Sequence, residues 1–415
     1  MNILLIYPQP DILRKPRFGF SYELLILATV LELKHKIHIK DYSCEDFNEN
    51  ELLMFCRNES IELVLIECDS FALKRSQNIV QASNIVNLLS PTIITVTYGN
   101  YCYITKKKFA SATHTIVEND INNIINIVNR YSSVIINEIN SFDDLPYINR
   151  GLLLKIPYYA RYSHCTLLQT AKGCENTCIF CQRKGWQNGY VMHSDDYVIN
   201  EIELIKQRGY KDIWIIDENF TFNLLRAKRL LKRIEKDSIS GGLNFFISSW
   251  ANIDDEFIRL AASCNIRIIS FGIESGNQEI LNYYRKNIRI NTIPDIIRYT
   301  NNCGIFTVGN FIIGAPKETK ESIEQTFSLI RKCEFDQVNI KILNYMIGSE
   351  LYESLDCLQK KSDSVFSCKE NGLTSFSLNE MVRIKEQFLK EYYKEHRVMI
   401  KNKIARFGKP YDTVF

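Results

Sequence analysis

Three cysteines at short spacing are the residues of this sequence best suited to chemistry. Cys174, Cys178 and Cys181 lie in the stretch Lys172-Gly173-Cys174-Glu175-Asn176-Thr177-Cys178-Ile179-Phe180-Cys181. Such short spacers let one loop bring three thiolates to three corners of an iron–sulfur cubane, and thiolate sulfur suits iron. The fourth iron would then have no protein ligand. The spacing therefore predicts a 4Fe-4S cluster with one open iron.

Spacing alone leaves two further roles open for these cysteines. A structural zinc site needs a fourth Cys or a His at similarly short spacing, and the nearest candidates, Cys165 and His193, stand in no familiar register. The three cysteines could also be ordinary buried thiols. We expect that role for most of the remaining ten of the thirteen cysteines, which are scattered singly along the chain.

The elements before the cysteine loop follow an alternating pattern. Short apolar runs at 3–7, 37–41, 63–67 and 92–96 predict strands, and helical patterns at 22–33 and 76–89 separate them. Strands that alternate with helices indicate a parallel sheet covered on both faces. The stretch 141–162 breaks this rhythm with prolines, a glycine and acidic residues, which is typical of a linker.

The alternation resumes at a longer period after the linker. We expect strands at 166–170, 213–216, 245–249, 266–271, 307–313 and 337–342, with helices such as 197–207 and 224–234 between them. Six such units predict a curved, partial barrel with its chemistry at the carboxyl ends of the strands. The charged, amphipathic stretch 378–403 predicts a packing helix.

The sequence thus predicts an α/β fold with four parts. A Rossmann-like or flavodoxin-like parallel-sheet domain is expected at 1–135 and a linker at 136–163. A partial (βα)6 TIM-type barrel is expected at 164–350, and a C-terminal helical region at 351–415.

The cysteine loop, with Phe180 before its last cysteine, resembles the signature of the radical S-adenosylmethionine (SAM) superfamily. Three further motifs occur in that family's order, two of them directly after expected strands and the third on an expected strand. They are Asp217-Glu218-Asn219-Phe220, Gly272-Ile273-Glu274-Ser275-Gly276 and the glycine-bearing stretch from Gly309 to Gly314. The resemblance covers residues 166–350 and is weaker outside them.

The resemblance implies a cofactor site and an activity. In that family SAM chelates the open iron, and the reduced cluster cleaves SAM to a 5'-deoxyadenosyl radical. The implied cluster ligands are Cys174, Cys178 and Cys181. The implied SAM-binding residues are Asp217, Glu218, Gly272, Glu274, Ser275, Gly309 and Gly314. An alternative for Asp217 is the capping of a helix that begins near Asn223. No catalytic residue beyond this site is identified.

The N-terminal domain resembles the cobalamin-binding domain that precedes the core in one subgroup of the family. That domain's glycine-rich turn is reduced here to Tyr98-Gly99-Asn100-Tyr101, and the cobalt-ligating Asp-x-His-x-x-Gly motif is absent. We expect His35, His38 and His114 to be surface or core residues. The domain is therefore interpreted as a degenerate one, although the resemblance leaves cobalamin open as a third cofactor.

Three functions follow from these patterns. The favoured one is hydrogen abstraction by the adenosyl radical, which modifies a peptide or small metabolite. The alternative is cobalamin-dependent methyl transfer. A non-catalytic iron–sulfur or binding protein is the alternative from another class, and the SAM-site motifs at 217–220, 272–275 and 309–314 argue against it.

Composition restricts the partners. The 51 basic residues nearly balance the 48 acidic ones, so no nucleic-acid or membrane partner is expected. The sequence begins without a signal-peptide pattern and has no apolar run near the ~20 residues of a bilayer crossing. For this reason we expect a cytoplasmic enzyme. Clustered thiols in such a reducing compartment suggest metal. Its expected partners are a reductant such as flavodoxin or ferredoxin and a small-molecule or peptide substrate.

Overall fold

The computed structural model describes residues 1–9, 21–68, 77–162, 165–185, 189–360 and 362–408, which divide into two compact units. The first contains Met1–Cys165 with the short segments Gln182–Asn188 and Ser362–Ser364. The second contains Thr166–Cys181, Gly189–Lys361 and Val365–Phe415.

The first unit is built on a parallel sheet with the strand order β2-β1-β3-β4-β5. Its strands are β1 (Asn2–Tyr7), β2 (Lys36–Asp41), β3 (Leu63–Glu67), β4 (Ile94–Tyr98) and β5 (His114–Thr115). Its helices are α1 (Tyr22–Glu32), α2 (Glu49–Asn58), α3 (Gln77–Leu89), α4 (Asn100–Thr105) and α5 (Ile121–Tyr131). This is the flavodoxin-like order, so the predicted fold class of this part is confirmed.

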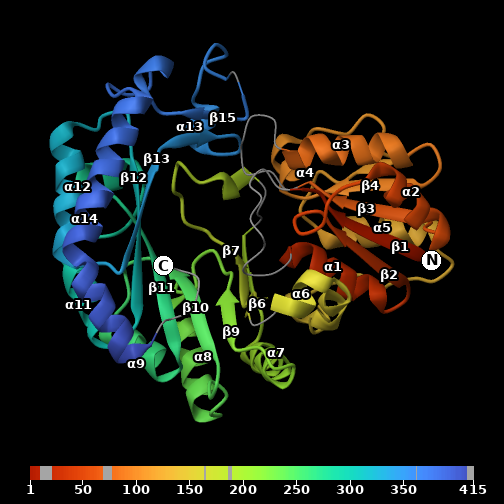
Figure 1. Ribbon diagram of the computed structural model, residues 1–415, viewed down its shortest axis with the longest axis horizontal. Helices are drawn as coiled ribbons and strands as arrows, with labels where there is room; N and C mark the ends of the chain where they lie inside the picture. The colour runs from red at the N-terminus through yellow and green to blue at the C-terminus, as the bar shows by residue number, and fades with distance from the viewer. Residues whose placement is uncertain (10–20, 69–76, 163–164, 186–188, 361, 409–415) are drawn as a thin grey trace. The chain divides into compact units, whose positions relative to one another are not determined.

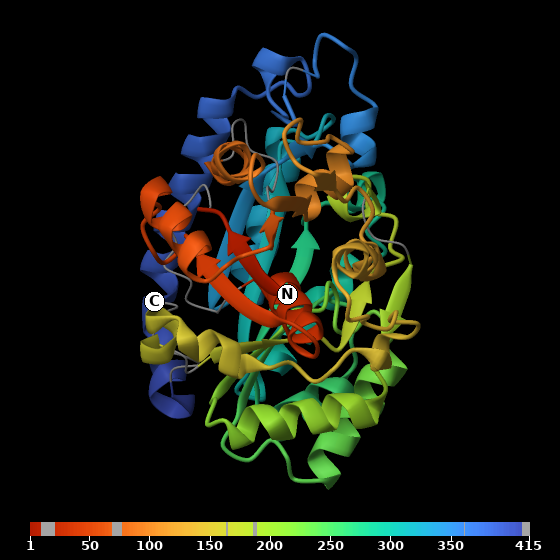
Figure 2. The same ribbon diagram turned by 90° about the vertical axis from the view of Figure 1, so that its right-hand side faces the viewer.

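Helices cover both faces of this sheet, with α1 and α3 on opposite sides in Figure 1. Figure 2 shows the red and orange strands from the side, near the chain's N-terminus. All five residues of β3 are buried, as expected for a strand between two helical layers. The strand predicted at 92–96 lies two residues later, because the amides of Thr92 and Ile93 bond back to the carbonyl of Leu89 and complete the turn after α3. The predicted start of that helix, Ser76, lies outside the described residues.

The segment expected to be a linker has local structure. It contains the 3₁₀ helices η1 (Phe142–Asp144) and η2 (Arg150–Lys155) and the helix α6 (Pro157–Tyr162). Leu152, Leu153 and Ile156 are buried in the first unit's core, and the Tyr159 hydroxyl donates to Asp41 Oδ2 at 2.6 Å. These residues therefore pack as part of the first unit. The division into four parts expected from sequence stays a prediction.

The second unit is built on an open six-stranded sheet with the order β13-β12-β11-β10-β9-β6. Its strands are β6 (Cys165–Leu168), β9 (Asp212–Ile215), β10 (Asn244–Ser249), β11 (Ile266–Glu274), β12 (Phe306–Ile313) and β13 (Gln337–Ile342). The strands from β9 to β13 pair in parallel. The predicted partial barrel is confirmed.

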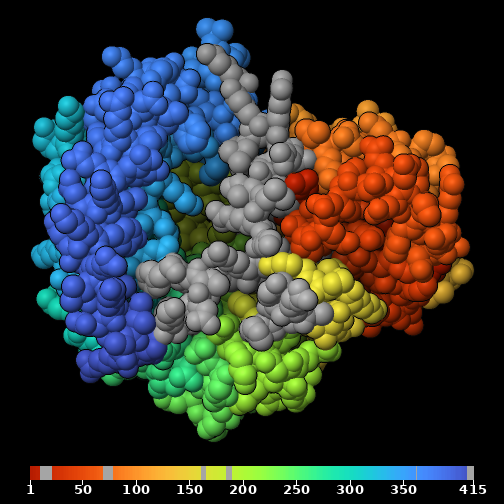
Figure 3. Space-filling model, viewed as in Figure 1, coloured from red at the N-terminus to blue at the C-terminus, as the bar shows by residue number. Residues whose placement is uncertain are grey.

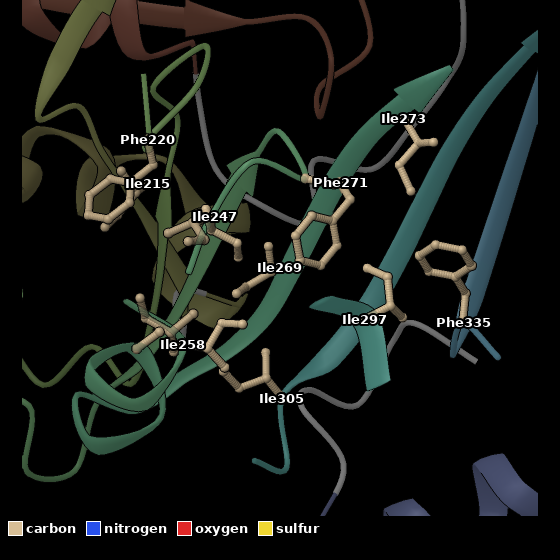
Figure 4. Packing of buried hydrophobic residues seen from close by; sticks show 14 of the residues in the cluster. Ile215, Phe220, Ile247, Ile258, Ile269, Phe271, Ile273, Ile297, Ile305 and Phe335 are labelled. Atoms are coloured by element: carbon tan, nitrogen blue, oxygen red, sulfur yellow. The ribbon is translucent and has the colours of Figure 1, made fainter. Parts of the chain in front are cut away.

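Helices connect these strands or follow the last of them. They are α7 (Asp195–Gln207), α8 (Leu224–Lys236), α9 (Asp255–Ser263), α10 (Gln278–Tyr283), η4 (Ile290–Thr292), α11 (Ile293–Asn302), α12 (Lys320–Cys333), α13 (Glu350–Glu353) and η5 (Lys369–Asn371). Two small sheets pair β7 (Ala171–Gly173) with β8 (Tyr190–Met192) and β14 (Asn344–Met346) with β15 (Ser364–Phe366). Figure 4 shows the core between the sheet and its helices, where Ile269 and Phe271 of β11 lie near Ile258 of α9.

Two strands of this sheet differ from their predicted bounds by more than one residue. The strand expected at 166–170 ends at Leu168, because the amides of Thr170 and Ala171 turn to a carboxylate instead of continuing the ladder. Strand β11 continues past its expected end at Phe271 to Glu274 and crosses a bulge between Gly272 and Glu274. Both differences lie at the carboxyl edge of the sheet.

The predicted tail helix is α14 (Leu378–Phe407), drawn in blue along the surface of its unit in Figure 3. The ammonium of Lys403 anchors it by donating to Asp336 Oδ2 at 2.5 Å, Asn301 Oδ1 at 2.7 Å and the Ile305 carbonyl at 2.7 Å. Among the described residues, no helix combines the length and the apolar character that crossing a membrane requires.

Candidate active site

A small hairpin strand directly precedes the first cysteine of the loop. Strand β7 pairs antiparallel with β8, and Gly173 stands opposite Tyr190. Gly173 has a φ of +96°, and a Cβ there would lie 2.0 Å from the carbonyl oxygen of Gly189. Only glycine fits this position. The hairpin therefore determines where the chain turns toward Cys174.

The three predicted cluster cysteines lie in one loop, and among them Cys178 is buried. Burial raises the pKa of the Cys178 thiol to about 11. The nearby charge of Lys286 lowers this pKa, and those of Cys181, Glu274 and Cys174 raise it. The loop also contacts the end of α10, because the Ile179 amide donates to the Tyr284 carbonyl at 3.3 Å. The cysteine loop and the predicted SAM-binding turn thus share one site.

These thiols fit a cluster better than a single ion. Among the described side chains, no group of three or more His, Cys, Asp or Glu residues is arranged to hold one metal ion. Each ligand of a cubane binds a different iron, so its three thiolates need not converge on one point. The donor set consists of thiols alone, which is the set that iron–sulfur clusters use.

Glu274 stands in a strained backbone conformation at the end of β11. Its φ is +74°, in the left-handed region that non-glycine residues rarely adopt, and the register with β12 shifts between Gly272 and Glu274. Such strain costs of order 1–3 kcal/mol and clusters at functional sites. A Cβ on Gly272 would lie 2.9 Å from Glu274 Oε1, so glycine there leaves room for this carboxylate.

Sequence reasoning missed the partner of Glu274. The Lys286 ammonium donates to Glu274 Oε1 at 2.9 Å, and the side chains of this pair are 3% and 11% exposed. The same ammonium lies 4.1 Å from the centre of the Trp250 ring. Lys286 follows helix α10, the first helix after the Glu274 turn. An unpaired acid at a strand end with a basic residue just past the next helix was the signal that could have identified it.

Asp217 and Glu218 reach toward the cysteine loop from the end of β9. Asp217 Oδ1 accepts the amides of Thr170 at 2.7 Å and Ala171 at 3.0 Å, and its Oδ2 accepts the Thr170 hydroxyl at 2.5 Å. Glu218 Oε2 accepts the Gly173 amide at 2.9 Å. Burial raises the pKa of Asp217 to about 6, although its hydrogen bonds with Thr170 and Ala171 and the charge of Arg226 lower it.

The capping alternative for Asp217 finds no support in these contacts. Helix α8 begins after Asn223, whose side chain accepts the Arg226 amide at 3.0 Å. Asp217 instead bonds to the strand that leads into the cysteine loop. Its predicted contact with SAM stays a prediction, as does that of Glu218.

The other predicted SAM-binding residues also lie in the second unit. Their polar groups, or the space that a glycine leaves free, are used in contacts within the protein. Ser275 is fully buried, and its hydroxyl accepts the Asn277 amide at 3.1 Å. A Cβ on Gly309 would lie 2.8 Å from the Phe311 ring, and one on Gly314 would lie 2.9 Å from the sulfur of Met381. These glycines allow close packing around β12, and their role toward SAM stays a prediction.

At the carboxyl edge of the first unit's sheet, the described residues around the glycine turn are closely packed. Tyr98 ends β4 opposite Glu67 of β3 and has no exposed surface. A Cβ on Gly99, whose φ is +107°, would lie 2.8 Å from the carbonyl oxygen of Cys68. Ser21 donates to Glu67 Oε1 at 2.7 Å. The remnant of the glycine turn therefore packs against protein backbone and does not form a cradle for a cofactor tail.

The three histidines weighed as cobalt ligands lie elsewhere in the first unit. His35 precedes β2, and His38 lies in its first half. His114 begins β5, and its Nε2 lies 2.9 Å from the Tyr131 hydroxyl. Ligands of such sheets bind at the carboxyl ends of the strands. None of these histidines stands at that edge, because each lies before a strand or in its first half.

Comparison with known proteins agrees with this geometry. Residues 168–330 match the radical SAM superfamily. An uncharacterised methyltransferase of Pyrococcus horikoshii is 24% identical over 394 residues, which cover 85% of this chain and 83% of that protein. Cytidylyl-2-hydroxyethylphosphonate methyltransferase of Streptomyces wedmorensis is 24% identical over 202 residues, 46% of this chain and 37% of that protein.

Two solved structures share the fold over most of the chain. The radical SAM methyltransferase TsrM from Kitasatospora setae, with cobalamin and a [4Fe-4S] cluster bound, gives a TM-score of 0.70 at 16% identity and covers 84% of this chain and 76% of its own. The cobalamin-dependent SAM radical enzyme OxsB, with aqua-cobalamin and SAM bound, gives a TM-score of 0.69 at 12% identity and covers 89% and 65%.

The motifs, the fold and these matches define the class of protein. Residues 168–330 match the radical SAM superfamily, and together with the relatives this match supports a radical SAM enzyme, of a family that uses a 4Fe-4S cluster and SAM and needs an electron donor. Within that family it resembles the subgroup in which a cobalamin-binding-like domain precedes the radical SAM core. The family assignment confirms the prediction of an enzyme and leaves the non-catalytic alternative without support.

Proposed function

We propose that this enzyme cleaves SAM reductively at a 4Fe-4S cluster bound by Cys174, Cys178 and Cys181. When bound, the cluster would supply the electron that converts SAM to methionine and a 5'-deoxyadenosyl radical, which abstracts hydrogen from a peptide or small metabolite. The observation that carries the proposal is the buried pair of Glu274 and Lys286 next to the cysteine loop, whose Ile179 amide donates to the carbonyl of Tyr284, two residues before Lys286.

The pair of Glu274 and Lys286 has the chemistry to bind SAM. SAM carries an ammonium group and ribose hydroxyls, which a carboxylate accepts as hydrogen-bond donors, and a carboxylate, which pairs with a lysine. Glu274 and Lys286 bond to each other at 2.9 Å in a nearly buried position. Groups that satisfy each other in this way stay ordered for a ligand that offers both partners. The Trp250 ring beside Lys286 restricts that ammonium further.

Cobalamin-dependent methyl transfer is the second candidate function. It is favoured by the relative of Pyrococcus horikoshii, described as a methyltransferase, and by the fold shared with TsrM and OxsB. The closed edge at Tyr98 and Gly99 argues against it, because the chain's own side chains and backbone occupy the space that a cofactor tail needs. We therefore favour direct hydrogen abstraction, with a flavodoxin or ferredoxin as the proposed reductant and the cytoplasm as the proposed location.

The proposed cofactor site can be tested by electron paramagnetic resonance of the anaerobically reconstituted, reduced protein. SAM should change the spectrum of the cluster, since its amino and carboxylate groups would bind the open iron. The same titration on Lys286→Met should require more SAM for the same change, while Lys228→Met, at a surface ion pair with Asp254, should match the wild type. A cluster signal that SAM leaves unchanged would contradict the proposal.

A further inference from the structure

We infer that Asp217 and Arg226 are positioning residues that clamp Thr170 and so hold the strand that leads to Cys174. The inference rests on the proposed function, because it assumes that the cysteine loop binds the cluster. It gives Asp217 a role different from the SAM contact that its motif predicts.

Each polar group of Thr170 is bonded. Its amide donates to Asp217 Oδ1 at 2.7 Å, and its hydroxyl donates to Asp217 Oδ2 at 2.5 Å. Arg226 donates from Nη1 to the same hydroxyl at 2.7 Å and from Nη2 to the Thr170 carbonyl at 3.0 Å. That carbonyl also accepts the His193 amide at 3.0 Å, from the residue that follows β8. Four segments of the second unit thus meet at one buried threonine.

The same pattern continues toward the first cysteine. Ala171 donates its amide to Asp217 Oδ1 at 3.0 Å, and Gly173 donates its amide to Glu218 Oε2 at 2.9 Å. Two consecutive acids at the end of β9 therefore accept amides along the approach to Cys174. Hydrogen bonds to a carboxylate are shorter and stronger than those between neutral groups, so they restrict this backbone more than a sheet ladder does.

The charges of the clamp depend on each other. The side chains of Asp217 and Arg226 are each 2% exposed, and Arg226 Nη1 lies 4.0 Å from Asp217 Oδ2. A buried carboxylate needs a compensating charge, and the planar guanidinium can reach two oxygens of Thr170 at once. A lysine has no such fork. Oδ1 of Asp217 accepts two amides and Oδ2 accepts the Thr170 hydroxyl, so three of the roughly four acceptor positions of this carboxylate already bind the approach to the loop.

The test compares Asp217→Asn with the wild type after anaerobic reconstitution. We expect the variant to lose its cluster to an iron chelator at least tenfold faster, because the amide side chain cannot accept three hydrogen bonds as the carboxylate does. In the loaded fraction its affinity for SAM should stay within threefold of the wild type. Asp195→Asn is the matched control. It removes a carboxylate that binds Arg229 at the surface of α8, the helix that also contains Arg226, and it should change neither quantity.

A second pair of variants keeps the test decisive if Asp217→Asn does not fold. Thr170→Val should also accelerate cluster loss, because it removes the bridging hydroxyl, and Thr170→Ser should restore the wild-type rate. An unchanged rate in Asp217→Asn or Thr170→Val would overturn the inference. So would a tenfold loss of SAM affinity at an unchanged rate, which would make Asp217 a SAM ligand. A wild-type protein that binds no cluster would instead refute the proposed function.

Discussion

The two parallel sheets of this protein have different kinds of residues at their carboxyl edges. In the first unit, Tyr98 and Glu67 are buried at that edge, and the turn at Gly99 packs against Cys68. In the second unit, the edge has a strained glutamate and a buried lysine, and the cysteine loop bonds to the end of the adjacent helix α10. Parallel sheets of both kinds offer a crevice at this edge. The comparison teaches that the topology supplies the place for a site. The side chains then decide whether that place is packed with protein or carries binding groups.

The backbone conformation separates the two edges further. At the carboxyl edge of the first sheet Gly99 has a positive φ, which costs glycine little, whereas at that of the second sheet the non-glycine residue Glu274 has one. A fold selected for stability alone would place glycine at both positions. The strain at Glu274 is retained where a carboxylate has a chemical use.

The largest expected effect is the loss of the cluster. Changing Cys174, Cys178 or Cys181 to Ala should abolish the broad visible absorption of the reconstituted protein and all SAM cleavage. The same change at Cys264, Cys303 or Cys357 should preserve both. An intact cluster in Cys178→Ala would show that the thiols of this edge are not its ligands.

The next effect concerns the strained turn. Glu274→Gln should weaken SAM binding roughly ten- to a hundredfold while the cluster is retained, because a charged hydrogen-bond partner contributes ~1.5–3 kcal/mol. Gly272→Ala should act in the same direction, since its Cβ would lie 2.9 Å from Glu274 Oε1 and 3.1 Å from Lys286 Nζ. Calorimetric titration of the loaded proteins measures both. SAM affinity equal to the wild type in Glu274→Gln would return this residue to a structural role.

A matched change at the first edge should affect stability and leave the cluster site unaltered. Gly99→Ala introduces strain at a φ of +107° and a contact of 2.8 Å with backbone, so it should cost ~2–4 kcal/mol in the free energy of unfolding. Gly209→Ala is the control, because it has a φ of +83° but open space around its Cβ, and should cost less. Urea unfolding followed by circular dichroism measures both. Equal costs would mean that the turn is not packed as described.

The smallest effect is a dependence of stability on pH. Burial raises the pKa of Glu318 from 4.5 to about 7, although the amides of Gly314 and Ala315 lower it. Its folded pKa exceeds the unfolded one, so its contribution is complete below pH 4.5 and is lost as the pH rises through 7. Glu318→Gln keeps an acceptor for both amides without the charge. It should therefore reduce the loss of stability between pH 5 and 8 by ~1–3 kcal/mol, and identical pH profiles would contradict this.

Regular patterns made much of the fold predictable. Continuous apolar runs located β1 and β3 within a residue, and alternation with helices predicted both parallel sheets. The cysteine spacing located the loop, because short spacers need no long-range information. The Glu274 motif located the turn but not its left-handed φ, which depends on the bulge against β12.

Long-range contacts could not be predicted from the sequence pattern. Lys286 meets Glu274 only because α10 folds back onto the turn, and Thr170 meets Asp217 across 47 positions of the chain. The expected linker looked irregular because prolines and a glycine interrupt its pattern. Its apolar side chains nevertheless pack into a core that they meet only after folding.

The most direct test of the contrast between the two edges is the product of turnover. Anaerobically reconstituted protein, with reductant and SAM, should form 5'-deoxyadenosine and methionine without S-adenosylhomocysteine. After incubation with excess hydroxocobalamin and desalting, it should retain no stoichiometric corrin absorbance. A one-to-one corrin complex that produces S-adenosylhomocysteine would show that the first edge opens for a cofactor, and methyl transfer would become the favoured function.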